Sequence, residues 1–282
     1  MNDSSVLERE VLQSVVDGMR LNTIKLPTLP EQAIRVRTVA ADPGVSLHTL
    51  AEEVARDPAL AARIIRVANS PLVRARSEIR SLPQAITRLG LNYVRDLVTV
   101  FALEGAFMPR NRVVGQALFQ IWSASKDMGA ICAVLARRSG RVSADQALLA
   151  GLMHAIGALP LLAAVDAHRT IEVDATELQR LVEEIHGELG GQILRAWRFT
   201  ESLACVPELY RDPFREHMGP ADLVDVVAVA DLLFRSAAGR IELPMSWPEI
   251  PPMIRLGLQE DEEVLANFSS HPDVMTTRSA LA

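Results

Sequence analysis

The stretch from Ala147 to Val165 constrains the fold most strongly, because His154 is the only strongly polar side chain in it. Its length is close to the roughly 20 residues of a membrane-spanning helix. Gly151 and Gly157 weaken a helix, however, and Pro160 would break the hydrogen-bond ladder. We therefore predict two short buried helices, joined between Gly157 and Pro160, in place of a single spanning helix.

Helical spacing of apolar residues continues through most of the chain, and segments with alternating β-branched residues are nearly absent. Ser46, Asp57, Ser81 and Ser143 each precede such an apolar run and are residues that favour a helix N-cap. The fold class that we predict is all-α, with a compact body of two helical lobes.

Two long helices are expected in the second lobe. One runs from Val113 to Arg138 and ends at Gly140. The other runs from about Ala175 to Trp197 and is expected to be interrupted by its glycines, which are Gly187, Gly190 and Gly191.

The chain divides by pattern into four segments. These are an N-terminal amphipathic helix (1–22), a first lobe (23–109) and a second lobe (110–240) that together form one domain (23–240), and a proline-containing C-terminal extension (241–282). The apolar stripe of the N-terminal helix consists of Val6, Leu7, Val11, Leu12, Val15 and Met19. In the extension we expect one short helix around Glu260 to Phe268 and then a loose tail.

Charge and cysteine usage narrow the functional class. The net charge of -6 argues against indiscriminate nucleic-acid binding. Cys132 and Cys205 lie among apolar neighbours, which favours a reduced setting over a disulfide framework. Asp3, Glu8 and Glu10 precede the first apolar run, the reverse of a secretory signal. We expect a cytoplasmic protein that does not associate with a membrane.

Arginines cluster between Arg56 and Arg95, where Asp57 and Glu78 are the only acidic residues. Charges beside an apolar helical stripe are usually a solvated face. The alternative is a docking surface for an anionic partner, because guanidinium groups hold carboxylates and phosphates bidentately. Nucleic acid is a weaker alternative, since no aromatic residues interleave with these arginines. The candidate partner-binding residues are Arg63, Arg66, Asn69, Arg74 and Arg76.

The order of short motifs along the chain resembles the HDOD (HD-related output) domain family over about Leu26 to Asp231. The first-lobe motifs are Leu26-Pro27-Thr28-Leu29-Pro30, Asp42-Pro43, Ser46 to Ala51, Asp57 to Arg63, Ala68-Asn69-Ser70, and Ser81 to Ile86 with Leu89-Gly90. The second-lobe motifs, similar to the helical core of the HD superfamily, are Trp122 to Ser125, Ala150 to His154, His186 to Gly190 and Ala230-Asp231. The resemblance implies a bacterial signalling module with an all-α HD-like fold.

The resemblance also implies a degenerate metal pocket in the second lobe. Active HD phosphohydrolases hold a metal with a first His, a His-Asp pair and a later Asp, a ligand set suited to water activation. Here Ala124 stands at the first position, His154 and Ala155 form the pair, Asp231 matches the later Asp, and His186 lies nearby in the motif order. One imidazole and one distant carboxylate cannot fix a metal, so we expect no metal, no cofactor and no catalytic residue.

These expectations describe a non-catalytic signal-transduction protein that binds other signalling proteins. An anionic nucleotide second messenger is an additional expected modulator, and a homo-oligomer is compatible with the sequence. Two alternatives stay open: a metal-dependent phosphohydrolase of the HD superfamily and a nucleic-acid-binding regulator.

Overall fold

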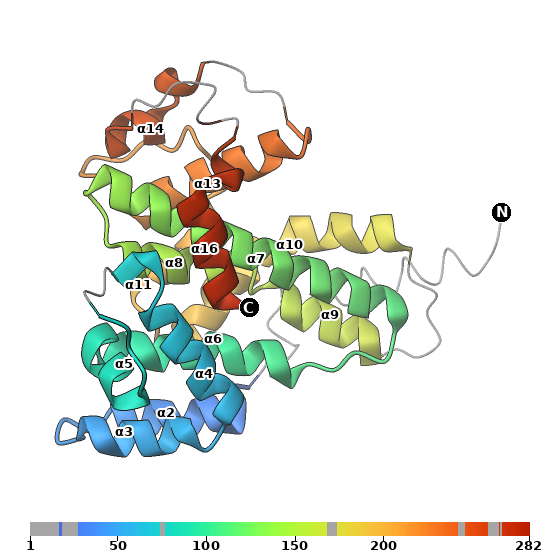
Figure 1. Ribbon diagram of the computed structural model, residues 1–282. Helices are drawn as coiled ribbons and strands as arrows, with labels where there is room; N and C mark the ends of the chain where they lie inside the picture. The colour runs from blue at the N-terminus through green and yellow to red at the C-terminus, as the bar shows by residue number, and fades with distance from the viewer. Residues whose placement is uncertain are drawn as a thin grey trace.

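All regular structure in the described part of the chain is helical, as the all-α prediction requires (Figure 1). The computed structural model describes residues 17–18, 28–73, 77–167, 174–241, 246–258, 265 and 267–282. Most of the predicted N-terminal helix and the predicted helix around Glu260 to Phe268 lie outside these residues.

The first lobe is built from five α-helices, which are α2 (Glu31–Ala40), α3 (Leu47–Ala55), α4 (Pro58–Ala68), α5 (Leu82–Leu89) and α6 (Leu91–Ala106), with a 3-10 turn, η1 (Pro71–Val73). The predicted caps are present, because the side chains of Ser46, Asp57 and Ser81 accept hydrogen bonds from the first turns of α3, α4 and α5. Gly90, with φ 87°, ends α5 and allows the sharp entry into α6.

The second lobe is organised around the long helix α7 (Arg112–Ser139), which Gly140 ends in a left-handed conformation as predicted. Around it lie α8 (Ala144–Met153), α9 (Ala158–Ala167), α10 (Ala175–Ala196), α11 (Glu201–Ala204), α12 (Val206–Leu209) and α13 (Leu223–Ala237). A Cβ on Gly151 of α8 would lie 2.7 Å from the backbone of Gly129 in α7. The two helices therefore cross backbone to backbone.

The apolar stretch that opened the sequence analysis forms α8 and α9, separated by a turn at residues 154–157. Among the described residues, Ala144–Ala167 is the one stretch long and apolar enough to cross a membrane. Its hydropathy window is 83% buried, however, as in the core helices of a soluble protein. The prediction of two short buried helices is confirmed.

Two predictions about helices are wrong. Helix α10 is continuous, and its glycines are sites of close approach: a Cβ on Gly190 would lie 2.6 Å from Pro207 Cβ of α12. The expected loose tail is instead a helix, α16 (Pro272–Leu281), in which Val274, Thr277 and Leu281 are buried.

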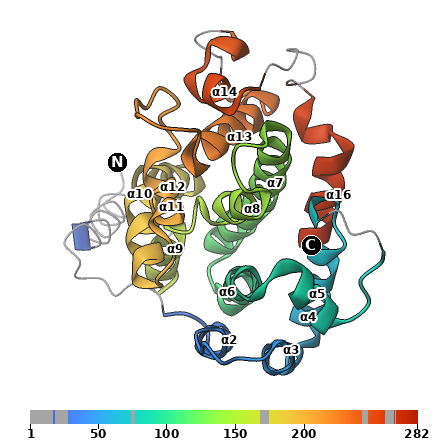
Figure 2. The ribbon, with the colours of Figure 1, turned by 90° about the vertical axis from the view of Figure 1, so that its left-hand side faces the viewer.

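Helix α16 packs on α7 of the second lobe and on α4 of the first, as Figure 2 shows. The Arg63 guanidinium of α4 donates to the Leu281 carbonyl at 2.7 Å and to Glu104 of α6 at 2.6 Å. Glu104 also pairs with Lys126 of α7 at 2.5 Å, and Arg278 pairs with Asp127 of α7 at 2.7 Å. The C-terminal helix thus ties the two lobes together. Before it lie η2 (Trp247–Glu249), α14 (Pro251–Leu256) and η3 (Phe268–Ser270).

Candidate functional site

The degenerate pocket lies where the turn between α8 and α9 meets α10, α12 and α13. Close packing sets its shape, because a Cβ on Gly157 would lie 1.9 Å from the His186 carbonyl oxygen and 2.5 Å from the Gly190 nitrogen. His154 begins this turn and His186 lies on α10, so Gly157 holds the two histidine-bearing segments against each other.

His154 is buried and held by its own turn. Its Nδ1 lies 2.7 Å from the Gly151 carbonyl oxygen, to which it donates as the neutral Nδ1–H tautomer. Its ring meets the Tyr210 ring edge-on, with centroids 5.3 Å apart and planes at 86°. Burial lowers the pKa of His154 to about 3, so the imidazole is neutral at physiological pH.

His186, Tyr210 and Arg211 form a hydrogen-bonded chain across the pocket. His186 Nδ1 donates to the Val182 carbonyl at 2.8 Å, which leaves Nε2 to accept from the Tyr210 hydroxyl at 2.9 Å. The Tyr210 oxygen in turn accepts from Arg211 Nε at 2.8 Å. Burial lowers the pKa of His186 and raises the pKa of Tyr210 to about 12. The chain is therefore fixed in one protonation pattern.

Asp231, the carboxylate of the pocket, faces positive charge on two sides. Arg235 pairs with it from the next turn of α13 at 3.2 Å. Burial raises the pKa of Asp231, and the charges of Arg211 and Arg235 oppose that rise. The charge of Arg211 also acts on His154, His186 and Tyr210. A fixed cation thus lies within electrostatic reach of every retained ligand position.

The two alanine positions supply no ligand. Ala155 lines a crevice of about 180 Å³ with Ser125 and otherwise apolar side chains, namely Ile121, Trp122, Leu152, Ile156 and Leu159. Ala124 lies half-buried beside Ser125 on α7. A divalent metal requires several converging donors and usually a carboxylate. The residues present do not fit a metal, because two positions carry no donor and Arg211 brings a competing positive charge.

The structure brings together His154, His186 and Asp231, as the resemblance implied, but sequence reasoning missed the side chains between them. Arg235 could have been found as the i+4 partner of Asp231 on one helix. Tyr210 and Arg211 follow a helix of four residues, and no periodicity marks them.

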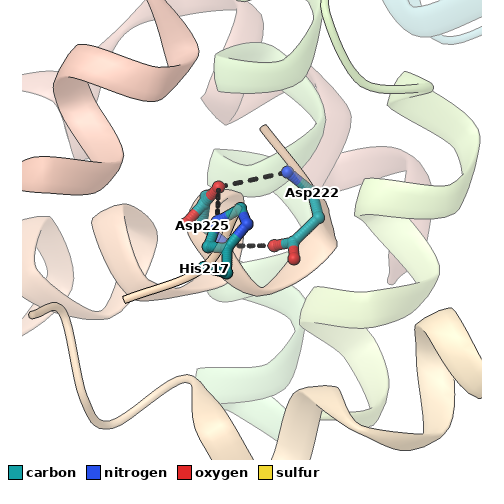
Figure 3. Close-up of side chains that lie close together, drawn as sticks. All are labelled: His217, Asp222 and Asp225. Atoms are coloured by element: carbon teal, nitrogen blue, oxygen red, sulfur yellow. Dashed lines mark hydrogen bonds and ion pairs between the residues drawn. The ribbon is translucent and has the colours of Figure 1, made fainter. Parts of the chain in front are cut away.

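A second group, His217, Asp222 and Asp225, has the composition of a metal site (Figure 3). Its carboxylates are already paired: Arg215 Nη2 contacts Asp222 at 2.7 Å, and Arg255 Nη2 contacts Asp225 at 2.6 Å. Asp222 and Asp225 also form a reciprocal capping box at the start of α13. Burial alone would raise the pKa of Asp225, but Arg255 and the Asp222 backbone N–H hold it below its ordinary value. The group is a buried ion-pair network that fixes the loop before α13.

The candidate partner-binding residues separate into different environments. Arg63 is largely buried, stacks 3.8 Å above the Phe101 ring and takes part in the α16 contact, so its guanidinium is used inside the molecule. Asn69 bonds the backbone of Ile79 in both directions and holds the segment after α4. Arg66 is exposed. Arg74 and Arg76 lie outside the described residues.

Comparison with known families identifies the chain. The sequence model of the HDOD domain matches residues 26–211. The chain belongs to the HDOD family. That match covers the first-lobe motifs and most of the second lobe, including His154, His186 and the Tyr210–Arg211 pair.

Solved structures resemble this HDOD protein over its whole length. A proposed metal-dependent phosphohydrolase from Shewanella amazonensis SB2B is 27% identical, with a TM-score of 0.82, covering 98% of this chain and 99% of that one. An HDOD domain protein of unknown function from Geobacter sulfurreducens is 22% identical, with a TM-score of 0.61 and 97% coverage of both chains. A proposed signal transduction protein from Marinobacter aquaeolei VT8 is 20% identical, with a TM-score of 0.58, over 99% of this chain and 66% of that one. No curated protein matches the sequence.

Proposed function

We propose that this HDOD protein is a non-catalytic signal-transduction component of the cytoplasm that acts by binding other proteins. Membership of the HDOD family and the likeness to a proposed signal transduction protein fit a regulatory role. The non-catalytic part of the proposal rests on the second-lobe pocket.

The observation that carries the proposal is the Tyr210–Arg211 pair. Tyr210 is fully buried between His154 and His186, and its hydroxyl is used by His186 and Arg211. A phosphohydrolase of the HD type would have to place a metal, a water molecule and a phosphate among these side chains. The aromatic ring and the guanidinium fill the space between the donors and bring the wrong charge for a metal.

The competing function is a metal-dependent phosphohydrolase, which the description of the Shewanella amazonensis structure suggests. Purified protein should carry no stoichiometric Mn, Fe or Mg by elemental analysis and should not hydrolyse bis(p-nitrophenyl) phosphate with added metal. His154→Ala serves as the matched variant, since a metal-supported activity would disappear with it. Stoichiometric metal together with turnover that His154→Ala abolishes would show that the protein is an enzyme.

Protein binding is supported by the loop between α12 and α13. The ion-pair network of Arg215, Asp222, Asp225 and Arg255 fixes this loop, yet Phe214 is 45% exposed and Met218 is fully exposed at 103%. Large apolar side chains on a fixed scaffold are typical anchors in protein interfaces, because little conformational entropy is lost on binding.

The binding proposal is tested with the immobilised full-length chain and a lysate of the cells that produce it. The double variant Phe214→Asp/Met218→Asp should lose a captured protein that the wild type retains. Met275→Asp, which changes an exposed apolar residue on α16, is the matched control and should retain it. Equal capture by all three chains would remove this loop from the proposal.

An anionic nucleotide second messenger is proposed as a modulator that binds outside the second-lobe pocket, because Tyr210 fills that pocket. Of the described first-lobe candidates, Arg66 has the guanidinium exposed to solvent. Calorimetric titration with a cyclic dinucleotide should give heat that Arg66→Glu removes. A nucleic-acid-binding regulator, by contrast, would show affinity for duplex DNA that falls steeply with salt.

A further inference from the structure

An apolar surface covers the start of α7 and the connector that leads into it. Met108 is 82% exposed and Phe119 is 75% exposed. Pro109 lies against Gly115, where an added Cβ would be 3.5 Å from the Pro109 ring, and Gly115 is one helical turn before Phe119. We name Met108, Pro109 and Phe119 the α7 apolar surface.

This surface continues toward the crevice beside Ala155. Trp122 lies one turn after Phe119 and lines that crevice. The Trp122 Nε1–H is buried and has no hydrogen-bond partner. An occupant would therefore meet apolar side chains together with one hydrogen-bond donor.

The N-terminal segment can reach this place. Helix α2 packs along α6, and in Figure 1 the first turn of α2 lies at the end of the first lobe from which the connector leads to α7. The nine residues from Met19 to Thr28 span at most about 30 Å when extended, on the order of a small domain's width. The segment thus meets the connector without crossing the molecule.

The sequence of the N-terminal segment complements the surface in polarity and in charge. Its apolar stripe falls on one face of the expected helix, with Gln13 on the opposite face. Residues 1–20 contain four acidic residues, Asp3, Glu8, Glu10 and Asp17, against Arg9 and Arg20. The charged residues exposed beside the α7 apolar surface are Arg110 and Arg112.

We infer that residues 4–20 dock on the α7 apolar surface of their own chain, with the Leu12 face toward Phe119 and Trp122. This intramolecular contact is independent of the proposed function. It would cover the largest exposed side chain of the second lobe's long helix and place acidic residues next to Arg110 and Arg112.

The test is photo-crosslinking in the full-length chain with p-benzoylphenylalanine in place of Phe119. Because Phe119 is exposed, the replacement should leave folding intact. Mass spectrometry should locate the crosslink within residues 1–22, and mixing isotope-labelled with unlabelled chains should show that both ends belong to one chain. The same amino acid in place of Ile254, exposed on α14, is the position control and should give no crosslink to residues 1–22. Crosslinks to a second copy, to other segments, or none at all from position 119 would overturn the inference.

Two N-terminal variants test the face that docks. Leu12→Asp should lower the crosslink yield at least about tenfold, since docking would bury an unpaired carboxylate. Gln13→Asp, which adds the same charge on the opposite face, should leave the yield unchanged. An equal effect of the two substitutions, or no effect of either, would contradict the proposed orientation.

Discussion

His154 should make the protein sensitive to acid. In the folded chain, burial lowers the pKa of His154 to about 3, whereas the unfolded chain presents an imidazole with the ordinary value of 6.5. The unfolded state therefore takes up a proton first as the pH falls. The free energy of unfolding is at its full value above about pH 6.5 and decreases progressively as the pH falls toward 3.

The size of this effect follows from the two pKa values. At pH 5 the unfolded imidazole is about 1.5 pH units below its pKa and the folded one is still neutral, which lowers the free energy of unfolding by about 2 kcal/mol. Below about pH 3 the loss from this one residue would reach about 5 kcal/mol, as an order of magnitude. Several carboxyl groups titrate over the same range, so a difference between variants is required.

Urea unfolding of the wild type and His154→Asn at about pH 8 and about pH 5 measures that difference. The Asn amide can donate to the Gly151 carbonyl as Nδ1 does but does not titrate. The variant should lose about 2 kcal/mol less than the wild type between the two pH values. His48→Asn, at an exposed position, is the control and should follow the wild type. If His154→Asn loses as much stability as the wild type, His154 is not held neutral by burial and the reasoning is refuted.

Three further substitutions test the packing of the molecule by urea unfolding. Gly157→Ala should cost at least about 3 kcal/mol, since the new Cβ overlaps the His186 backbone, whereas Gly44→Ala should be nearly neutral; similar values for both would contradict the close approach. Tyr210→Phe should cost about 1–3 kcal/mol because it leaves His186 and Arg211 without a partner, and a neutral result would deny the hydrogen-bonded chain. Arg63→Ala should cost about 2–4 kcal/mol by breaking the contact with α16, against about 0.5 kcal/mol or less for exposed Arg66→Ala, and equal costs would argue against the tie between the lobes.

The sequence was sufficient for most helix boundaries because caps and breakers act locally. Ser143, for example, accepts from the Gln146 N–H as its position predicts, and the turn after Met153 lies where the apolar stretch contains glycine. The C-terminal helix was missed because Pro272 was interpreted as part of a proline-rich tail. Proline also favours the first turn of a helix, and Val274 and Leu281 repeat after seven residues on one face.

The candidate site was less predictable. The positions of His154, His186 and Asp231 followed from a resemblance, and the absence of ligands at Ala124 and Ala155 could be read directly. That Tyr210 and Arg211 fill the pocket depends on the fold of a short helix against α10, which no local pattern encodes. Long-range contacts between side chains of this kind require three-dimensional information.

The position of α16 has a consequence for the order of folding during synthesis. Residues 31–237 can form both lobes before residues 272–281 leave the ribosome, so the Leu281 carbonyl reaches Arg63 of α4 only after the rest of the structure exists. A nascent or truncated chain that ends before Pro272 therefore has both lobes but lacks the element that fastens one to the other.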